Sequence, residues 1–193
     1  MAGSGIGKIF RVTTWGESHG KALGAVVDGC PAGYNLSENI IQEYLNRRRP
    51  GRSKYSTPRK ESDTVEILSG VFEGKTTGTP ISMTVKNENQ KSKDYSEIAE
   101  YYRPGHADFG FDKKYGFRDY RGGGRSSGRE TIGRVCGGAI ACEILKSKGI
   151  SLLTYTKAIG NIEIDKNKFN KDEIDANPLY MPDAESAERS AEY

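Results

Sequence analysis

Hydrophobic and polar residues follow two spacings along this chain, and the spacings separate predicted strands from predicted helices. Runs rich in β-branched residues and bounded by glycine or proline predict strands, because such side chains fit a pleated surface. Apolar residues three and four positions apart predict helices, because they share one helical face. Strands are predicted over residues 7–14, 23–28, 65–72, 81–86 and 150–164, and helices over residues 37–47, 96–102, 127–149 and from about 183. The chain is therefore expected to combine strands and helices.

The helix predicted over residues 127–149 contains glycine at an unusual density. Gly133, Gly137 and Gly138 lie in its interior, where each glycine costs up to ~1 kcal/mol relative to alanine. Close packing of another backbone against the helix is the physical reason to accept this cost. We therefore expect the helix to be central to the fold.

Length and composition exclude several classes of protein. The chain has 193 residues, which suits one domain or part of a larger one. No stretch approaches the ~18 consecutive apolar residues of a transmembrane helix, and the first residues do not resemble a signal peptide. Cys30, Cys136 and Cys142 lack metal-ligand spacing, which predicts reduced thiols. A cytoplasmic protein without a membrane partner is expected.

Charge is distributed unevenly, although the formal net charge is only +3. Residues 47–60 are rich in arginine and lysine, whereas residues 161–193 hold nine acidic and four basic residues. The basic segment indicates a polyanion or a small molecule with several negative charges as partner. An RNA-binding module, with Tyr55 as a stacking ring, is one alternative. A small anionic ligand held by arginines, without nucleic acid, is the preferred interpretation.

The sequence GESHG at residues 16–20 follows a predicted strand and carries one of two histidines. It fits the GxSxG pattern of serine hydrolases, with Ser18 as nucleophile. That motif needs a helix after the turn, and here a β-branched segment follows, so the hydrolase is kept only as an alternative. We expect His19 to lie on an exposed turn, where an imidazole can transfer protons near neutral pH.

The second histidine lies in RPGHAD, residues 103–108, again beside glycine. Asp108 follows His106 by two residues and could orient its ring. Two histidines without thiolate or carboxylate partners at ligand spacing are too few for an ordinary zinc site. No metal is therefore expected, and general acid chemistry is the better hypothesis.

A glycine-rich segment, RGGGRSSGRE at residues 121–130, precedes the central helix. Ser127 and Glu130 have the spacing of a capping box, which predicts that the helix starts at Ser127. Backbone N–H groups at a helix N-terminus, with Arg125 and Arg129 alongside, favour an anion such as phosphate. The segment matches neither GxxxxGK[ST] nor GxGxxG, so neither ATP nor a Rossmann fold is predicted.

Taken together, these segments resemble the chorismate synthase family. The matching stretches, in the family's order, are FRVTTWGESHG, VVDGCPAG, RRRPG, ILSGVFEGKTTGTPI, YRPGHAD and YRGGGRSSGRETIGRVCGGA. The resemblance implies an α+β fold, a β-α-β sandwich with central close-packed helices between antiparallel sheets. It also implies a cytoplasmic homotetramer of the shikimate pathway, which supplies aromatic amino acid biosynthesis.

The activity implied by the resemblance is that of a lyase. The family converts 5-enolpyruvylshikimate 3-phosphate to chorismate and phosphate by an anti-1,4 elimination. It requires reduced FMN, and some members reduce this flavin themselves with NADPH. The family runs to roughly twice this length, so residues 1–193 are expected to be the N-terminal portion of a single domain. Without the C-terminal half, FMN binding and turnover are expected to be weak or absent.

The resemblance also assigns roles to individual residues. His19 would protonate the departing phosphate, and His106 would act on the reduced flavin. The residues expected at FMN are Arg125, Ser126, Ser127 and His106. Arg48 and Lys54 are expected at NADPH or substrate, where lysine replaces a frequent arginine at position 54. The arginines expected at the substrate phosphate and carboxylates are Arg48, Arg103 and Arg129.

Overall fold

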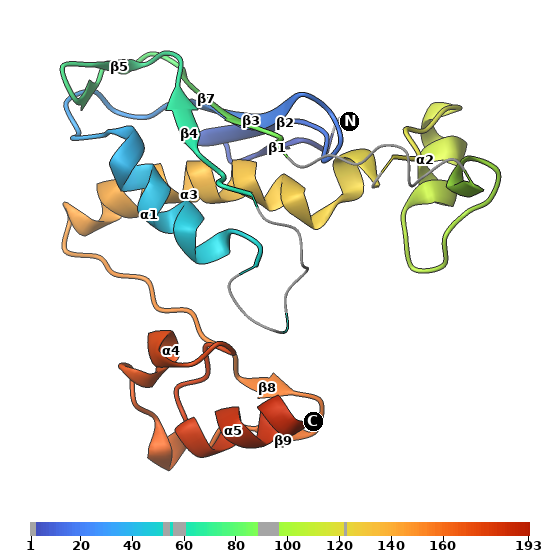
Figure 1. Ribbon diagram of the computed structural model, residues 1–193. Helices are drawn as coiled ribbons and strands as arrows, with labels where there is room; N and C mark the ends of the chain where they lie inside the picture. The colour runs from blue at the N-terminus through green and yellow to red at the C-terminus, as the bar shows by residue number, and fades with distance from the viewer. Residues whose placement is uncertain (1–2, 52–54, 56–60, 89–96, 122) are drawn as a thin grey trace. The chain divides into compact units, whose positions relative to one another are not determined.

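The computed structural model describes residues 3–51, 55, 61–88, 97–121 and 123–193 (Figure 1). Lys54 lies outside the described residues. The chain divides into two compact units. The described part of the first unit comprises residues up to 51 and between 61 and 149, and the second comprises Tyr55 with residues 150–193.

The first unit is built on a five-stranded antiparallel sheet with strand order β1-β2-β3-β7-β4. The strands are β1 (Gly5–Ile6), β2 (Arg11–Gly16), β3 (Ala22–Asp28), β7 (Ile81–Lys86) and β4 (Val65–Ile67). The central strand β3 pairs with β2 on one side and with β7 on the other. Ala25 lies at the middle of this sheet, opposite Thr14 on β2 and Met83 on β7.

Two helices, α1 (Glu38–Arg48) and α3 (Thr131–Lys146), cover one face of this sheet (Figure 1). The apolar faces of α1 and α3 form one core with the inward side chains of the strands. The two helices are also joined by a hydrogen bond of 2.7 Å from Tyr44 Oη to Glu143 Oε1. The sequence predicted both helices, because each has a regular apolar face.

Close packing against α3 is found at two of the three glycines, and another backbone makes the contact only at Gly133 among them. A Cβ atom at Gly133 would lie 2.8 Å from the carbonyl oxygen of Gly24 on β3. One at Gly137 would lie 2.7 Å from a methyl group of Val12 on β2. At Gly138 a Cβ atom would meet no described residue within 4 Å. The glycines therefore allow α3 to rest directly on β2 and β3, whereas Gly138 faces open space.

The strand predicted over residues 65–72 is interrupted. It forms β4 and then β5 (Val71–Phe72), which pairs with β6 (Lys75–Thr76) in a separate hairpin. Gly70 has a φ of +82°, and a Cβ atom there would lie 2.7 Å from the carbonyl oxygen of Pro80. The pairing of this segment with β7 ends before this left-handed residue. The run of apolar residues gave no sign of the interruption.

Two segments of the first unit differ from their predicted state. The helix predicted over residues 96–102 is only a 3₁₀ helix, Glu97–Ala99. The glycine-rich segment after it, for which no helix was predicted, contains α2 (Asp108–Tyr115). Gly116, with a φ of +73°, ends α2 by donating a hydrogen bond of 2.8 Å to the Asp112 carbonyl. The irregular pattern of aromatic, basic and glycine residues hid this helix.

The second unit is small and has its own apolar core, formed by Ile164, Met181 and Ala187. Its elements are β8 (Ala158–Ile159), β9 (Ile162–Glu163), α4 (Glu173–Ala176) and α5 (Ala184–Glu192). The long strand predicted over residues 150–164 is therefore wrong, and only a short hairpin forms. The acidic helix was predicted correctly, and Asp183 caps it by accepting hydrogen bonds from the N–H groups of Glu185 and Ser186.

None of the helices in the described residues is long and apolar enough to cross a membrane. In the same part of the chain, no group of three or more histidine, cysteine, aspartate or glutamate residues is placed to hold a metal ion.

Candidate functional site

His19 lies in the turn that joins β2 to β3. The turn begins at Gly16, which has a φ of +88°, and the N–H of Gly20 donates a hydrogen bond of 3.1 Å to the Glu17 carbonyl. The prediction of an exposed turn is wrong for this residue, because His19 is only 9% exposed. Its Nδ1 atom lies 3.1 Å from Ser18 Oγ. The ring is therefore held in a fixed position inside the protein.

The surroundings of Ser18 differ from those of a hydrolase nucleophile. The turn leads into strand β3, whereas a nucleophile elbow leads into a helix. Ser18 is also fully buried, with 0% of its surface exposed. The serine-hydrolase alternative therefore lacks the local structure that its motif needs.

The glycine-rich segment lies beside this turn. The backbone N–H of Ser18 is 3.5 Å from the Gly124 carbonyl, in a 3₁₀ helix, Gly124–Ser126. Ser127 then caps a second 3₁₀ helix, Gly128–Glu130, which continues into α3, and Ser127 Oγ accepts a hydrogen bond of 3.3 Å from the Arg129 N–H. The predicted helix start at Ser127 is confirmed in this form.

Arg125 fastens the glycine-rich segment to the end of β2. Its Nη1 donates to the Gly16 carbonyl at 2.9 Å and to Glu130 Oε2 at 2.6 Å. Its Nη2 donates to the carbonyl and the hydroxyl of Thr14, both at 3.0 Å, and to Ser4 Oγ at 3.2 Å. Glu130 therefore pairs with Arg125 and does not close the capping box that its spacing suggested.

Two of the predicted substrate arginines meet on one carboxylate. Arg48 Nη1, at the end of α1, donates to Asp63 Oδ2 at 2.7 Å, and Arg129 Nη1 donates to Asp63 Oδ1 at 2.7 Å. Asp63 is 1% exposed and has a φ of +48°. Arg129 Nη2 is buried 3.5 Å from Glu61 Oε2 and has no hydrogen-bond acceptor among the described residues. Both terminal nitrogens of Arg129 therefore face buried carboxylates.

Sequence reasoning missed Asp63, which lies in a polar segment without a recognisable motif. Its left-handed backbone and its two partners far along the chain leave no local signal. Glu61 was missed for the same reason.

The loop that carries His106 is organised by Asp108. Asp108 Oδ2 accepts hydrogen bonds from Arg103 N at 3.0 Å and Nε at 2.8 Å, and Oδ1 accepts one from Nη2 at 2.8 Å. These bonds hold the pKa of Asp108 at about 2, well below its ordinary value. The carboxylate therefore orients Arg103, whereas the ring of His106 is exposed and lies 3.2 Å from the Pro104 carbonyl through Nδ1.

Arg103 lies close to the glycine-rich segment. A Cβ atom at Gly123 would be 4.0 Å from Arg103 Nη2. The structure thus brings together the His19 turn, the segment around Gly124 and Arg103, and it joins Arg48 to Arg129 through Asp63. The exposed His106 lies in the same loop as Arg103, and its backbone N–H donates a hydrogen bond of 3.2 Å to the Arg103 carbonyl.

A cavity of about 530 Å³ adjoins Gly124 and Arg125. Its wall contains the aromatic residues Phe111, Tyr115 and Phe117 and the cationic residues Lys114, Arg118 and Arg134. Arg118 Nη1 and Glu130 Oε1 are buried polar atoms that have no hydrogen-bond partner among the described residues. The wall also contains the acidic residues Glu17, Asp119 and Glu130, so its charge is mixed, and its aromatic side chains suit a flat ligand. The alternation of aromatic and basic residues over 109–118 was the available sequence signal.

Comparison with known proteins gives one consistent result. The family model for chorismate synthase matches residues 10–193. The chorismate synthase of Agathobacter rectalis is 70% identical over 193 residues, which are 100% of this chain and 53% of that protein. That of Lachnoclostridium phytofermentans is 65% identical over the same share of each chain.

A solved structure described as a crystal structure of chorismate synthase is also similar. It is 33% identical, has a TM-score of 0.73, and is matched over 96% of this chain and 53% of its own. The mixed α+β arrangement with antiparallel sheets therefore corresponds to the fold of that structure. The chain spans about half the length of the relatives that it matches.

Proposed function

This chain belongs to the chorismate synthase family, and we propose that the full-length protein converts 5-enolpyruvylshikimate 3-phosphate to chorismate and phosphate. The observation that supports the proposal most directly is the buried His19 turn beside the glycine-rich segment and near Arg129. The substrate carries a phosphate and two carboxylates, and a proton donor among arginines suits the departure of a phosphate.

We assign the role of acid to His19. In the elimination, the bond from the ring carbon to the phosphate oxygen breaks and its electron pair leaves with phosphate. The ring hydrogen leaves as a proton, and the electron pair of its C–H bond forms a new ring double bond while the existing one shifts toward the carbon that lost phosphate. The ring thus becomes a diene without net oxidation. His19 Nδ1 lies against Ser18 Oγ, and we propose that Nε2 delivers the proton to the phosphate.

The arginines bind and orient the anionic groups of the substrate. We propose that Arg129 Nη2, a buried donor without a hydrogen bond to the described residues, donates to a phosphate or carboxylate oxygen. Arg48 lies across Asp63 from it, and Arg103 is fixed by Asp108. Because Asp63 and Asp108 set the guanidinium positions before substrate arrives, little reorganisation is needed on binding.

Reduced FMN fits the residues present in two respects. The cavity next to Arg125 has aromatic walls and cationic groups, and Arg118 Nη1 is a buried donor in that wall. We propose that Arg125, Ser126, Ser127 and His106 contact the cofactor. When bound, its electron-rich ring stabilises the electron-deficient substrate. In family members that reduce their own flavin, NADPH is the proposed reductant. Arg48 and Lys54 are the residues that we propose to contact NADPH or the substrate.

The remaining expectations concern the whole protein. We propose that residues 1–193 are the N-terminal portion of a single domain, in which a second antiparallel sheet encloses α1 and α3. A cytoplasmic homotetramer within the shikimate pathway is part of the same proposal. It is supported by the family membership and by Gly138, whose open surroundings leave room for a further element beside α3.

The test uses the full-length protein with reduced FMN and 5-enolpyruvylshikimate 3-phosphate under anaerobic conditions. Chorismate should appear as an increase in its absorbance. His19→Ala and His106→Ala should each lower kcat by roughly 10–10⁴-fold with unchanged circular dichroism, because each removes one proton-transferring group. Near-normal turnover in both variants would contradict these roles. Labelling of Ser18 by a fluorophosphonate would instead support the hydrolase alternative.

A further inference from the structure

We propose that Asn87 is a positioning residue that fixes the His19 turn to Arg129. The inference rests on the proposed function, in which the turn supplies the acid and Arg129 binds an anionic group of the substrate. Nothing in the sequence motifs singles out Asn87, which follows the last residue of β7.

Asn87 uses its side chain and its backbone to contact two segments of the chain, residues 17–21 and Arg129. Its Nδ2 donates to the carbonyls of Glu17 at 3.0 Å and Gly20 at 2.8 Å, which are the two ends of the His19 turn. Its backbone N–H donates to the Lys21 carbonyl at 3.1 Å. Its Oδ1 accepts a hydrogen bond of 2.6 Å from Arg129 Nε.

The chemistry of these partners fixes the orientation of the amide. Both carbonyls only accept, so the nitrogen must face the turn. The guanidinium of Arg129 only donates, so the oxygen must face Arg129. A carboxamide is the side chain that satisfies both requirements at this size. Aspartate has no donor for the carbonyls, and leucine has neither donor nor acceptor.

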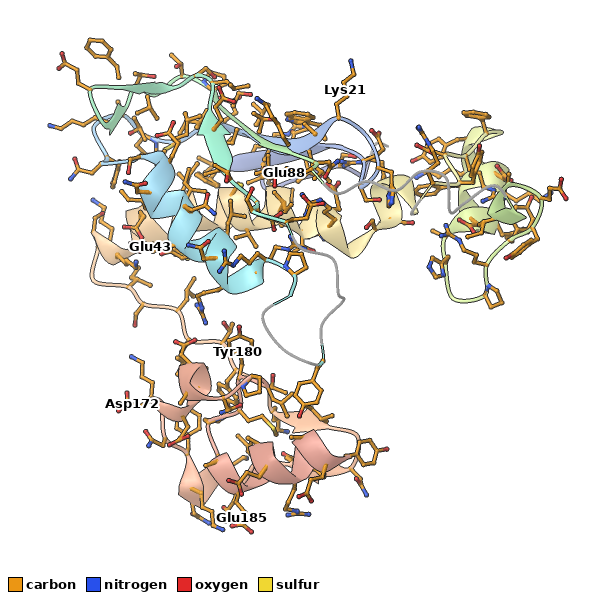
Figure 2. The ribbon with its side chains drawn as sticks, in the orientation of Figure 1. Lys21, Glu43, Glu88, Asp172, Tyr180 and Glu185 are labelled. Atoms are coloured by element: carbon orange, nitrogen blue, oxygen red, sulfur yellow. The ribbon has the colours of Figure 1, made fainter. Side chains whose placement is uncertain are left out.

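These contacts link the proposed acid to the proposed anion site through one side chain. The turn at residues 17–20 is also held by the bond from Gly20 N to the Glu17 carbonyl and by the long contact from Ser18 N to the Gly124 carbonyl. Arg129 in turn is fixed by Asp63. Glu88, labelled in Figure 2, adds a bond of 3.0 Å from its N–H to Glu61 Oε2, so two successive residues after β7 contact this network.

The position of this turn matters for a proton transfer. A displacement of a catalytic group by about 1 Å is enough to lower a rate by roughly 10²-fold. Without Asn87, the two turn carbonyls lose a shared donor and Arg129 loses an acceptor. We therefore expect His19 to lose its fixed distance from the substrate while substrate binding by the other arginines is largely kept.

The experiment compares Asn87→Asp with the wild type in the full-length protein. Asp keeps the size and the acceptor for Arg129 but places a carboxylate oxygen against the two carbonyls. We expect kcat to fall by roughly 10–10²-fold with KM changed less than about threefold. Hydrogen exchange of the amides at residues 17–20 should accelerate by at least about 10-fold, and the His19 ring signals in NMR spectra should move.

Asn161→Asp is the matched control, because Asn161 is exposed in the β8–β9 turn and the change adds the same charge. This control should leave kcat, exchange and the His19 signals as in the wild type. Asn87→Asp with kcat within twofold of the wild type and unchanged exchange would overturn the inference. So would a lower thermal stability with normal kcat for the folded enzyme, since that would indicate a purely structural role.

The two proposals can fail separately. If the wild type forms no chorismate, the proposed function fails, whereas hydrogen exchange and the His19 signals still decide whether Asn87 holds the turn. If the wild type is active and Asn87→Asp does not change the turn, only the role of Asn87 fails.

Discussion

Two buried aspartates bind the three arginines that the proposed function requires. Asp63 joins Arg48 and Arg129, and Asp108 binds Arg103 through its backbone and its guanidinium. A buried ion pair of this kind contributes little to stability by itself, because desolvation offsets the attraction. Its effect is to fix the direction of a long side chain. The arginines that we propose to bind substrate are thus positioned by buried aspartates.

The Asp108 carboxylate gives a prediction with a defined pH window. Hydrogen bonds from Arg103 lower its pKa from 3.8 to about 2. Because the folded pKa is below the ordinary value, the ionised carboxylate stabilises the fold above about pH 4, and this contribution is lost as the pH falls through about 2. The measurement is the pH titration of the Asp108 carboxyl carbon by NMR in the full-length protein.

Arg103→Gln is the comparison variant. It removes the positive charge and two of the three donors, so the midpoint should rise toward 3.8. A wild-type midpoint already near 3.8 would show that Arg103 does not hold Asp108 in solution.

Sequence reasoning found some of these residues and missed others for a physical reason. His19, His106 and Arg129 lie in glycine-rich motifs, where local composition signals a turn or an anion site. Asp63 and Asn87 act through partners 15 to 70 residues away in the chain, so no local pattern marks them. The burial of His19 was also missed, because neighbouring glycines indicate a turn but not what covers it.

At the scale of elements, glycines that lack a side chain allow α3 to lie close to the sheet. Gly133 and Gly137 let its backbone approach β2 and β3, and the N-terminus of the helix then lies beside the His19 turn. Periodicity predicted this helix, and the helical glycines predicted the close contact. In contrast, the residue pattern over 150–164 predicted one long strand. Within this range the structure contains only the short hairpin in which Ala158–Ile159 pairs with Ile162–Glu163.

Alanine substitutions on α3 test this packing. Gly137→Ala places a methyl group 2.7 Å from Val12, and the overpacking should lower the free energy of unfolding by about 1–3 kcal/mol. Gly138→Ala lies one residue away, about 100° around the helix, and meets no described residue within 4 Å. In the 193-residue chain it should raise stability by up to about 1 kcal/mol through helix propensity. Thermal unfolding of both variants measures the difference.

The same pair also tests the surroundings of α3 in the longer protein. If a further element packs beside Gly138 there, Gly138→Ala should become destabilising in the full-length protein. Equal effects of the two substitutions in the 193-residue chain would contradict the packing described for Gly137.

At the scale of the whole molecule, the chain presents surfaces that suit further contacts. It spans 53% of the Agathobacter rectalis protein and of the similar crystal structure. Large apolar side chains are exposed among the described residues, with Ile9 at 89% and Phe117 at 81%. Lys21, labelled in Figure 2, projects away from the sheet beside the His19 turn. A site formed by segments far apart in the sequence cannot be predicted from local residue pattern. The proposed site is of this kind, because Asn87 contacts the His19 turn and Arg129.

The final prediction concerns how much of the cofactor site these residues supply. Of the residues that we assign to FMN, Arg125 lines the cavity beside Gly124, and the relatives that the chain matches are about twice as long. We therefore expect the 193-residue chain to bind FMN at least roughly 100-fold more weakly than the full-length protein, equivalent to about 2.8 kcal/mol of lost contact. Quenching of FMN fluorescence measures both affinities. Supplying the remaining residues as a second chain should restore binding, because the missing contacts are supplied without a covalent link. Full affinity and chorismate formation by residues 1–193 alone would show that this half already contains the complete site.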